Sequence, residues 1–255
     1  MSSETRYSDF DAIERIYYSS VDEEIYEVYV AKLEELILQY LPKGAHIFDL
    51  CCGRGYLAQP LLKKGYQVTG LDGSEEFLRY ARKIAPGIEF ILDDIRYFKL
   101  PPTFHAVVSV GNSLNNTMSI EEMESVFHNS YVALLENGLF AFELMLEEYY
   151  LLNLSVPTSS GGVEDDFAWI DRHIYDTEKK IAQKNFTKFQ LVKGEWQRSD
   201  VTFLTKPYST TEIQSALEKV GFTDISIYDK KGDLGVHDAA GIACFVCRKP
   251  LKSEN

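Results

Sequence analysis

The residues best placed to do chemistry form a short loop, Asp49-Leu-Cys-Cys-Gly53-Arg-Gly55-Tyr-Leu-Ala58. An apolar run at 46–50 predicts a strand directly before this loop, and a helical pattern follows at about 56–64. Glycines at such a turn let backbone N–H groups approach a ligand closely, and the start of the helix adds a partial positive charge. The loop therefore predicts a site for a nucleotide cofactor.

Two acids near this loop bear on the kind of nucleotide. The spacing Gly53-x-Gly55-x-x-Ala58 fits a dinucleotide fingerprint, and Asp72 follows about 20 residues later, where it suits a ribose hydroxyl. Asp49, however, ends the first predicted strand and would lie beside the ligand. A carboxylate there attracts a cationic group and repels a pyrophosphate. Asp49 therefore favours an adenosine cofactor that carries a positive charge.

A third acid completes this pattern. Asp94, which follows the third predicted strand, could accept a hydrogen bond from an adenine amino group while the N–H of Ile95 meets a ring nitrogen. Carboxylates at the ends of three successive strands describe a cofactor with a ribose, an adenine and a cationic tail. S-adenosylmethionine has these parts.

The elements that must position these residues alternate between strands and helices. Alternation of this kind indicates βαβ units with right-handed crossovers, and hence an α/β fold with a parallel sheet and helices on both faces. The expected strands are 46–50, 66–71, 88–92, 105–110 and 139–144, and the expected helices are 56–64, 74–84 and about 119–135. Helix starts are predicted by a serine cap at Ser74 and by capping boxes at Ser119/Glu122 and Ser209/Glu212, and a helix end by Gly221.

The alternation breaks after the fifth strand. Three longer runs, 169–175, 180–191 and 196–206, predict an antiparallel meander inserted into the sheet domain. A helix at 209–220 and two strands at 224–228 and 241–247 then complete the chain. The first 40 residues show helical periodicity and no strand pattern.

Composition limits the partners and the compartment. The 255 residues carry a formal net charge of −13, which opposes binding to nucleic acid or to anionic membranes. No apolar run approaches the ~20 residues of a membrane span, and the polar N-terminus has no signal-peptide core, so a cytoplasmic protein is expected. Cys244 and Cys247 lie three apart in a predicted strand and so point to opposite faces, which predicts buried small side chains and no metal site.

These motifs resemble those of the class I S-adenosylmethionine-dependent methyltransferases. The loop at 49–58 resembles their glycine-rich motif, GLDGS at 70–74 their ribose-binding loop, and LDDI at 92–95 their adenine-binding loop. LLENGLFAFEL at 134–144 is similar to their turn into strand five. Two positions depart from the family pattern, because Cys51 replaces a usual glycine and Asn137 replaces a common proline or glycine.

The resemblance implies a doubly wound, seven-stranded, mostly parallel sheet whose last strand is antiparallel, with an inserted antiparallel β meander. Three regions follow from it. Residues 44–144 and 209–249 form the cofactor-binding Rossmann-like core, residues 1–43 an N-terminal helical cap, and residues 145–208 an insertion that serves as a substrate lid or dimer contact.

The resemblance also implies a role for individual residues. Asp49 and the backbone from Cys51 to Gly55 would lie near the methionine part of the cofactor, and Asp72 would bind the ribose. The remaining implied contacts are Gly73 and Ser74 near the adenine, Asp94 and Ile95 on its polar edge, and Val110 and Gly111 beside the sulfonium, together with Gly53 in the loop.

The implied activity is transfer of a methyl group from S-adenosylmethionine to a nitrogen or oxygen atom of a small molecule. VGNSLNN at 110–116 resembles the loop after strand four of small-molecule methyltransferases. Two alternatives stay open: a Rossmann-type NAD(P)-dependent oxidoreductase, and an inert module that binds S-adenosylmethionine without turnover.

The catalytic residues are less defined than the cofactor site. A hydroxyl acceptor would profit from a general base, whereas a neutral amine requires none. Glu143 and His173 are candidates for such a base, and Asn112 and Tyr17 for orienting a substrate. The acceptor and its reacting atom stay open, as does the choice between monomer and homodimer.

Overall fold

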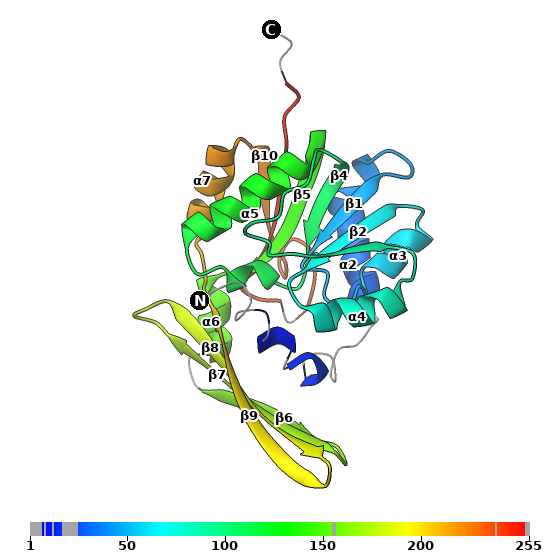
Figure 1. Cartoon of the computed structure of the whole chain (residues 1–255). Coiled ribbons are helices and arrows are strands. Elements are labelled where there is room, and N and C mark those ends of the chain that lie inside the picture. The colour runs from blue at the N-terminus through cyan, green and yellow to red at the C-terminus, as the bar shows by residue number, and fades with distance from the viewer. Residues whose placement is uncertain are drawn as a thin grey trace.

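Two β-sheets organise the chain, as Figure 1 shows. The computed structural model describes residues 7, 9–11, 13–16, 25–154, 157–237 and 239–252. Seven strands form sheet A, which carries helices on both faces, and four strands form sheet B, which projects from one end of sheet A. The short helical segment made of residues 7, 9–11 and 13–16, called the N-terminal segment below, lies between the two sheets (Figure 1).

Sheet A has the predicted topology. Its strand order is β10-β11-β5-β4-β1-β2-β3, and β11 runs antiparallel to both of its neighbours while the other pairs are parallel. The order reverses between β1 and β4, and ligands of such sheets bind in the crevice at this point. The strands are β1 (His46–Leu50), β2 (Gln67–Asp72), β3 (Glu89–Leu92), β4 (Phe104–Ser109), β5 (Leu134–Met145), β10 (Thr223–Asp229) and β11 (Ile242–Arg248).

The helices follow the local signals in most places. Ser74 caps α4 through its Oγ, which accepts the N–H of Phe77 at 3.2 Å, and Gly221 ends α7 with a left-handed φ of 111°. The helical elements are α2 (Ile25–Leu36), α3 (Ala58–Lys63), α4 (Glu75–Ile84), α5 (Ile120–Ala133), α6 (Glu147–Leu154) and α7 (Thr210–Val220), with short 3₁₀ turns η1 (Leu38–Tyr40) and η2 (Ser113–Asn116).

One predicted capping box is only half formed. Ser209 and Glu212 make the full reciprocal box at α7. At α5, Ser119 accepts the N–H of Glu122, but the Glu122 carboxylate accepts the N–H of Met118 at 2.7 Å and pairs with Arg96 at 2.6 Å. The prediction for Glu122 was therefore wrong in its partner, because a guanidinium from the loop after β3 competes for this carboxylate.

Sheet A is packed on both faces by apolar side chains. Phe142 and Phe245 stack with their ring centroids 5.0 Å apart, and Phe127 packs on Phe142 from α5. Val30 and Leu33 of α2 cover the opposite face. Cys244 and Cys247 are buried on opposite faces of β11, as predicted, since Cys244 contacts Glu143 whereas Cys247 joins the cluster around Phe245. This packing on both faces holds the strand ends of sheet A in fixed positions.

Sheet B contains one strand more than the sequence predicts, and a helix precedes it. The antiparallel order is β6 (Thr158–Val163), β7 (Phe167–Asp176), β8 (Ile181–Val192) and β9 (Glu195–Thr205). The missed strand β6 has the sequence TSSGGV, which lacks the apolar alternation of a strand, and it forms by pairing with β7. Helix α6 was also missed, since its sequence EEYYLLNL shows little amphipathic pattern.

The inner face of sheet B is apolar and closes on the N-terminal segment. Phe167, Phe186 and Phe203 pack there against Ile13 and Ile16. Burial of these side chains joins sheet B to the N-terminal segment through the hydrophobic effect. Among the described residues, no helix is long and apolar enough to cross a membrane.

Candidate active site

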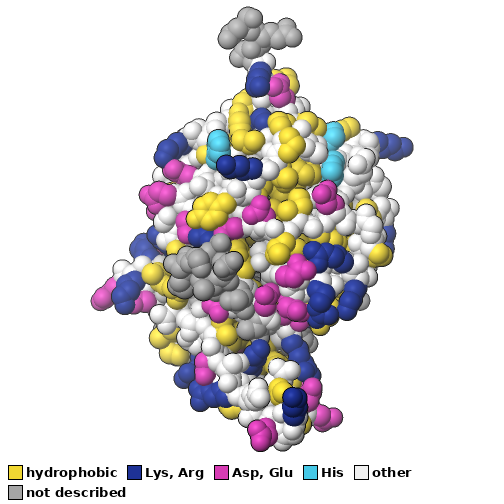
Figure 2. All heavy atoms as spheres, viewed as in Figure 1, with side chains coloured by type: hydrophobic (Ala, Val, Ile, Leu, Met, Phe, Trp, Pro, Cys, Tyr) yellow, Lys and Arg dark blue, Asp and Glu magenta, His cyan; other side chains and the backbone are white. Residues whose placement is uncertain are grey.

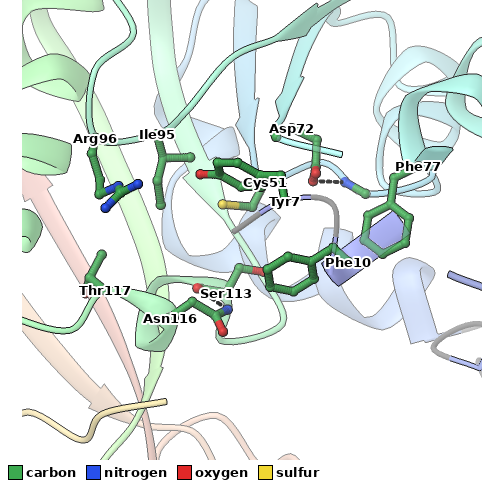
Figure 3. A pocket seen from close by; sticks show the side chains of 12 residues that line it. Tyr7, Phe10, Cys51, Asp72, Phe77, Ile95, Arg96, Ser113, Asn116 and Thr117 are labelled. Atoms are coloured by element: carbon green, nitrogen blue, oxygen red, sulfur yellow. Dashed lines mark hydrogen bonds between the residues drawn. The ribbon is translucent and has the colours of Figure 1, made fainter. Parts of the chain in front are cut away.

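A cavity of about 710 Å³ lies at the carboxyl ends of β1, β2 and β3. This strand-end cavity is drawn in Figure 3, where Cys51 and Asp72 face the rings of Tyr7 and Phe10. Its walls are formed by Tyr7, Phe10, Cys51, Gly53, Asp72, Gly73, Phe77, Ile95, Arg96, Ser113, Asn116 and Thr117. The cavity coincides with the crevice where the strand order reverses.

The glycine loop enters the cavity in an unusual backbone conformation. Cys51, Gly53 and Gly55 all have positive φ angles, of 64°, 54° and 73°. Glycine adopts this region freely, whereas a residue with a Cβ is strained there. Gly55 also lies close to its neighbours, since a Cβ at this position would be 3.0 Å from the ring of Phe90. The loop therefore presents backbone to the cavity, as predicted from its glycines.

Asp72 lines the cavity and holds the glycine loop. Its Oδ2 accepts the N–H of Gly53 at 2.9 Å, and its Oδ1 accepts the N–H of Ser74 at 2.9 Å. Burial nevertheless raises the pKa of Asp72 to about 6, because hydrogen bonds from backbone N–H groups only partly replace hydration. Its charge is thus incompletely compensated by the protein alone.

Asp49 is a buried acid that has no counterion among the described residues. It is 1% exposed, and its Oδ2 has no hydrogen-bond partner among the described residues. Burial, with a smaller contribution from the neighbouring charge of Asp72, raises the pKa of Asp49 to about 7. A cationic group placed beside this carboxylate would restore its charged form.

The loop after β3 carries an ion pair that the sequence did not predict. The Asp94 carboxylate pairs with the Arg96 guanidinium at 2.6 Å, and the hydroxyl of Tyr7 donates to Asp94. Despite partial burial, the hydrogen bonds and charge of Arg96 keep the pKa of Asp94 below its usual range. Asp94 therefore remains an anion whose acceptor sites are shared with Arg96 and Tyr7.

The N-terminal segment roofs the strand-end cavity. The Tyr7 ring lies so close to Gly73 that a Cβ at position 73 would be 2.0 Å from it. Asp11 accepts hydrogen bonds from the Ser74 hydroxyl at 2.5 Å and from the N–H of Glu76 at 3.2 Å. These contacts anchor the segment to the start of α4, beside the cavity.

The same segment reaches sheet B. Phe10 packs on Phe203 with a centroid distance of 4.5 Å, and Arg15 forms ion pairs with Glu164 and Asp166. The N-terminal segment thus contacts both the core and sheet B on either side of the cavity.

A second cavity adjoins the first on the sheet B side. This sheet-B cavity has a volume of about 380 Å³, which includes space open to solvent, and it shares Phe10, Ser113 and Asn116 with the strand-end cavity. It is lined by Phe10, Ile13, Gly111, Asn112, Ser113, Asn116, Met145, Lys184, Phe186, Phe203 and Thr205. Asn112 has a left-handed φ of 61°, and its Oδ1 is buried without a hydrogen-bond partner among the described residues.

The structure distributes the predicted site residues over three places. The strand-end cavity gathers Cys51, Gly53, Asp72, Gly73 and Ile95 in its wall, with Asp49, Gly55, Ser74 and Asp94 in the adjoining strand ends and loops. Gly111 and Asn112 line the sheet-B cavity instead. Val110 and Glu143 line a separate hollow on the α2 side of sheet A.

The three catalytic candidates that the structure describes do not converge on one point. Glu143 is engaged by Lys230 at 2.7 Å and by the N–H of Gly111 at 3.2 Å. His173 lies on the inner face of sheet B with its Nε2 3.2 Å from Asp171, and burial, followed by the charge of Lys184, lowers the pKa of His173. Tyr17 lies outside the described residues.

Sequence reasoning missed several wall residues. Arg96, Ser113 and Asn116 lie within or beside loops that were already singled out, so only their orientation was missing. Lys184 was hidden in a predicted strand, where its inward position depends on the register of sheet B. The one available signal was its spacing of two residues from Phe186, which places both side chains on the same face of a strand.

Comparison with known proteins identifies the fold and the chemistry. A family described as "Methyltransferase domain" matches residues 47–138. A methyltransferase-named protein of Geobacillus sp. (strain WCH70) is 32% identical over 237 residues, covering 90% of this chain and 95% of the relative. This chain belongs to the class I S-adenosylmethionine-dependent methyltransferases.

Two further similar proteins have names that state an activity. The dTDP-3-amino-3,4,6-trideoxy-alpha-D-glucopyranose N,N-dimethyltransferase of Streptomyces venezuelae is 30% identical over 98 residues, covering 38% of this chain and 41% of that enzyme. The structure of S-adenosylmethionine-bound CalS10, an amino pentose methyltransferase from Micromonospora echinaspora, superposes with a TM-score of 0.71 at 17% identity, covering 93% of this chain and 96% of that one. The latter shows a shared fold.

The chain is therefore a methyltransferase enzyme with S-adenosylmethionine as its cofactor. Its own residues fit this cofactor, because the orphaned Asp49 carboxylate suits a cationic tail and the glycine loop offers backbone close to the cavity. The expectation of a methyltransferase is confirmed, and S-adenosylmethionine is favoured over the nicotinamide alternative.

Proposed function

We propose that this methyltransferase transfers a methyl group to a nitrogen or oxygen atom of a small molecule held between sheet A and sheet B. The observation that carries the proposal is the pair of adjoining cavities, which share Phe10, Ser113 and Asn116 as walls. The strand-end cavity takes the cofactor, and the sheet-B cavity, of about 380 Å³, takes the acceptor. Residues 145–208 then act as the substrate lid.

The proposed cofactor contacts follow the strand ends. Asp49 and the backbone of Cys51, Gly53 and Gly55 hold the cationic methionine part, and Asp72 binds the ribose. Around the adenine and the sulfonium, the proposed contacts are Gly73, Ser74, Asp94, Ile95, Val110 and Gly111. The burial of Asp49 and the place of Asp72 in the cavity wall support this assignment.

The cofactor supplies a methyl group that is already activated on a sulfonium, so the protein mainly aligns the acceptor and excludes water. Phe10 and Phe203 pack against each other and line the sheet-B cavity with apolar surface. Asn112 offers an amide beside the acceptor. If the acceptor is a hydroxyl, His173 is the proposed base, because Glu143 is held in an ion pair with Lys230.

Relatives and surface charge support a small acceptor. The names of similar proteins include a dTDP-amino-sugar N,N-dimethyltransferase and a ubiquinone biosynthesis O-methyltransferase. On the face in Figure 2, acidic and basic side chains are interspersed. The formal net charge of −13 opposes a polyanionic acceptor such as nucleic acid.

An acceptor screen tests the proposal. The full-length protein is incubated with S-adenosylmethionine and separate panels of small amines, phenols and acids, single-stranded RNA, and unfolded protein, and release of S-adenosylhomocysteine is measured. We expect release above the acceptor-free rate with members of the small-molecule panel only. Turnover with RNA or protein alone would overturn the proposal.

A further inference from the structure

The sheet-B cavity combines apolar walls with one cation. Phe10, Ile13, Phe186 and Phe203 supply aromatic and aliphatic surface, and Lys184 enters from β8. Lys184 stands opposite His173 of β7 and Phe203 of β9 in the strand register, so all three belong to the inner face of sheet B. The cavity therefore suits a ligand with an apolar body and a group that attracts a cation.

Lys184 has no partner within the part of the chain that the structure describes. It forms no hydrogen bond and no ion pair with a described residue. Other inward-lying cations are each satisfied: Lys230 pairs with Glu143, Arg96 with Asp94 and Glu122, and Lys249 donates to the carbonyl oxygens of Tyr131 and Leu134. These cations are paired within the described part of the chain, whereas Lys184 is not, so its ammonium is available there to an acceptor supplied by a ligand.

Asp171, the carboxylate that attracts Lys184, already has other partners. Asp171 Oδ1 accepts the N–H and the hydroxyl of Ser160, at 2.8 and 2.5 Å, and Asp171 Oδ2 lies 3.2 Å from His173. Burial lowers the pKa of Lys184 despite the attraction of Asp171, which shows that Asp171 does not fully compensate the ammonium. An anion in the sheet-B cavity would complete this compensation.

A second residue in the cavity wall also has a polar atom without a hydrogen-bond partner among the described residues. The side-chain oxygen of Asn112 is buried and lacks a hydrogen bond among the described residues. Asn112 belongs to the loop after β4, on the sheet A side of the cavity, whereas Lys184 lies on the sheet B side. A ligand between them can contact both.

We propose that Lys184 recognises a carboxylate on the methyl acceptor, and that the apolar body of this acceptor packs against Phe10, Phe186 and Phe203. This inference rests on the proposed function, since it assigns the acceptor to the sheet-B cavity. A single carboxylate is compatible with the negative charge of the chain, because Lys184 provides a local positive field where the overall field is repulsive.

A matched pair of probes tests this recognition. The protein saturated with S-adenosylhomocysteine is titrated calorimetrically with trans-cinnamate and with its neutral isostere trans-cinnamamide. We expect cinnamate to bind at least about 10-fold more tightly, and we expect Lys184→Met to abolish this preference while cinnamamide binding stays unchanged. Lys184→Arg keeps the charge and should keep most of the preference.

Controls separate recognition from folding and from the proposed function. Lys188→Met removes a lysine four residues further along β8 on the same face and should leave the preference intact. Binding of S-adenosylhomocysteine shows that each variant is folded. No wild-type preference for cinnamate, benzoate or octanoate over their amides would overturn the proposal, as would a preference that survives Lys184→Met or is lost in Lys184→Arg. Methylation of neutral small molecules alone would overturn it while leaving the proposed function intact.

Discussion

The carboxylate of Asp72 and the backbone N–H of Gly53 are joined by a hydrogen bond of 2.9 Å. This bond links the end of β2 to the loop after β1. The other oxygen of Asp72 binds the N–H of Ser74, so one side chain connects three parts of the strand-end cavity. Asp72 therefore shapes the glycine loop and also presents an acid to the cavity.

Replacing Asp72 should weaken cofactor binding. Asp72→Ala removes an acceptor for two backbone N–H groups and the proposed ribose ligand, and hydrogen bonds to charged groups contribute about 1.5–3 kcal/mol. We expect the Kd for S-adenosylhomocysteine, measured by calorimetry, to rise about 10- to 100-fold. Asp72→Asn keeps one acceptor oxygen and should cause a smaller rise. An unchanged Kd in Asp72→Ala removes the ribose assignment.

The buried Asp49 should make the cofactor-free protein less stable as pH rises. Its pKa is about 7 in the folded chain against 3.8 ordinarily, so between these values the folded state binds more protons than the unfolded state. Stability therefore falls through this window, by at most about 4 kcal/mol. Asp72, with a pKa of about 6, acts in the same direction.

Asp49→Asn tests this pH dependence. The variant should gain stability against urea at pH 8 and little at pH 5, because only the charged carboxylate is costly to bury. Its affinity for S-adenosylmethionine should fall at pH 8. Equal urea midpoints of wild type and variant at pH 8, with equal cofactor affinity, would contradict the role given to this carboxylate.

Cys51 occupies a backbone conformation that favours glycine. Its φ of 64° lies in the left-handed region, which costs a residue with a side chain about 1–2 kcal/mol, while glycine adds unfolded-state entropy of about 0.4–1 kcal/mol. We expect Cys51→Gly to stabilise the protein by about 1 kcal/mol or less in urea unfolding. Cys51→Ala keeps the strain and serves as the control, so an equal gain in Cys51→Ala would locate the effect in the thiol.

Local signals in the sequence were sufficient for most of sheet A and for the glycine loop. Ser74, Gly221 and the strand-end acids act through neighbours close in the chain or through the regular alternation of strands and helices. Right-handed crossovers then give a parallel sheet with helices on both faces. The place of the glycine loop and of the strand-end acids in the fold could therefore be predicted from the sequence.

The remaining parts depend on contacts between distant segments. Strand β6 forms because Gly162 lets the ring of Trp169 lie across it, where a Cβ would be 2.1 Å from the ring. Tyr7 contacts Gly73 and Asp94, which are distant from it in the sequence, and no sequence periodicity predicts such a contact. The direction in which Lys184 points is set by the register of β7, β8 and β9.

Phe10 should couple the two cavities. It lines both, and it packs on Phe203 at 4.5 Å and on Phe77 at 6.5 Å. Phe10→Ala opens both cavities to water, so we expect the Kd for S-adenosylhomocysteine and the KM for the screened acceptor each to rise about 10-fold. Phe189→Ala, on the outer face of sheet B, is the matched control and should leave both unchanged. An effect on only one ligand would show that Phe10 belongs to a single cavity.

Glu143 should act as a positioning residue. One of its oxygens pairs with Lys230 at 2.7 Å, and the other accepts the N–H of Gly111 at 3.2 Å, which fixes the loop between β4 and η2. Lys230→Met leaves a buried charge unpaired and should destabilise the protein by about 3–5 kcal/mol. The double variant Glu143→Leu, Lys230→Met removes both charges and should regain most of that stability.

The double variant separates positioning from stability. Its Gly111 N–H has lost its acceptor, so the loop that carries Asn112 is less well held, and we expect kcat for the screened acceptor to fall about 10-fold while the Kd for S-adenosylhomocysteine changes less than threefold. The exposed pair of Lys219 and Glu124 provides the control, because breaking it with Lys219→Met should alter neither stability by more than about 1 kcal/mol nor turnover. Wild-type kcat in a stable double variant would confine Glu143 to a purely structural role, since turnover would then be independent of the bond that it makes to Gly111.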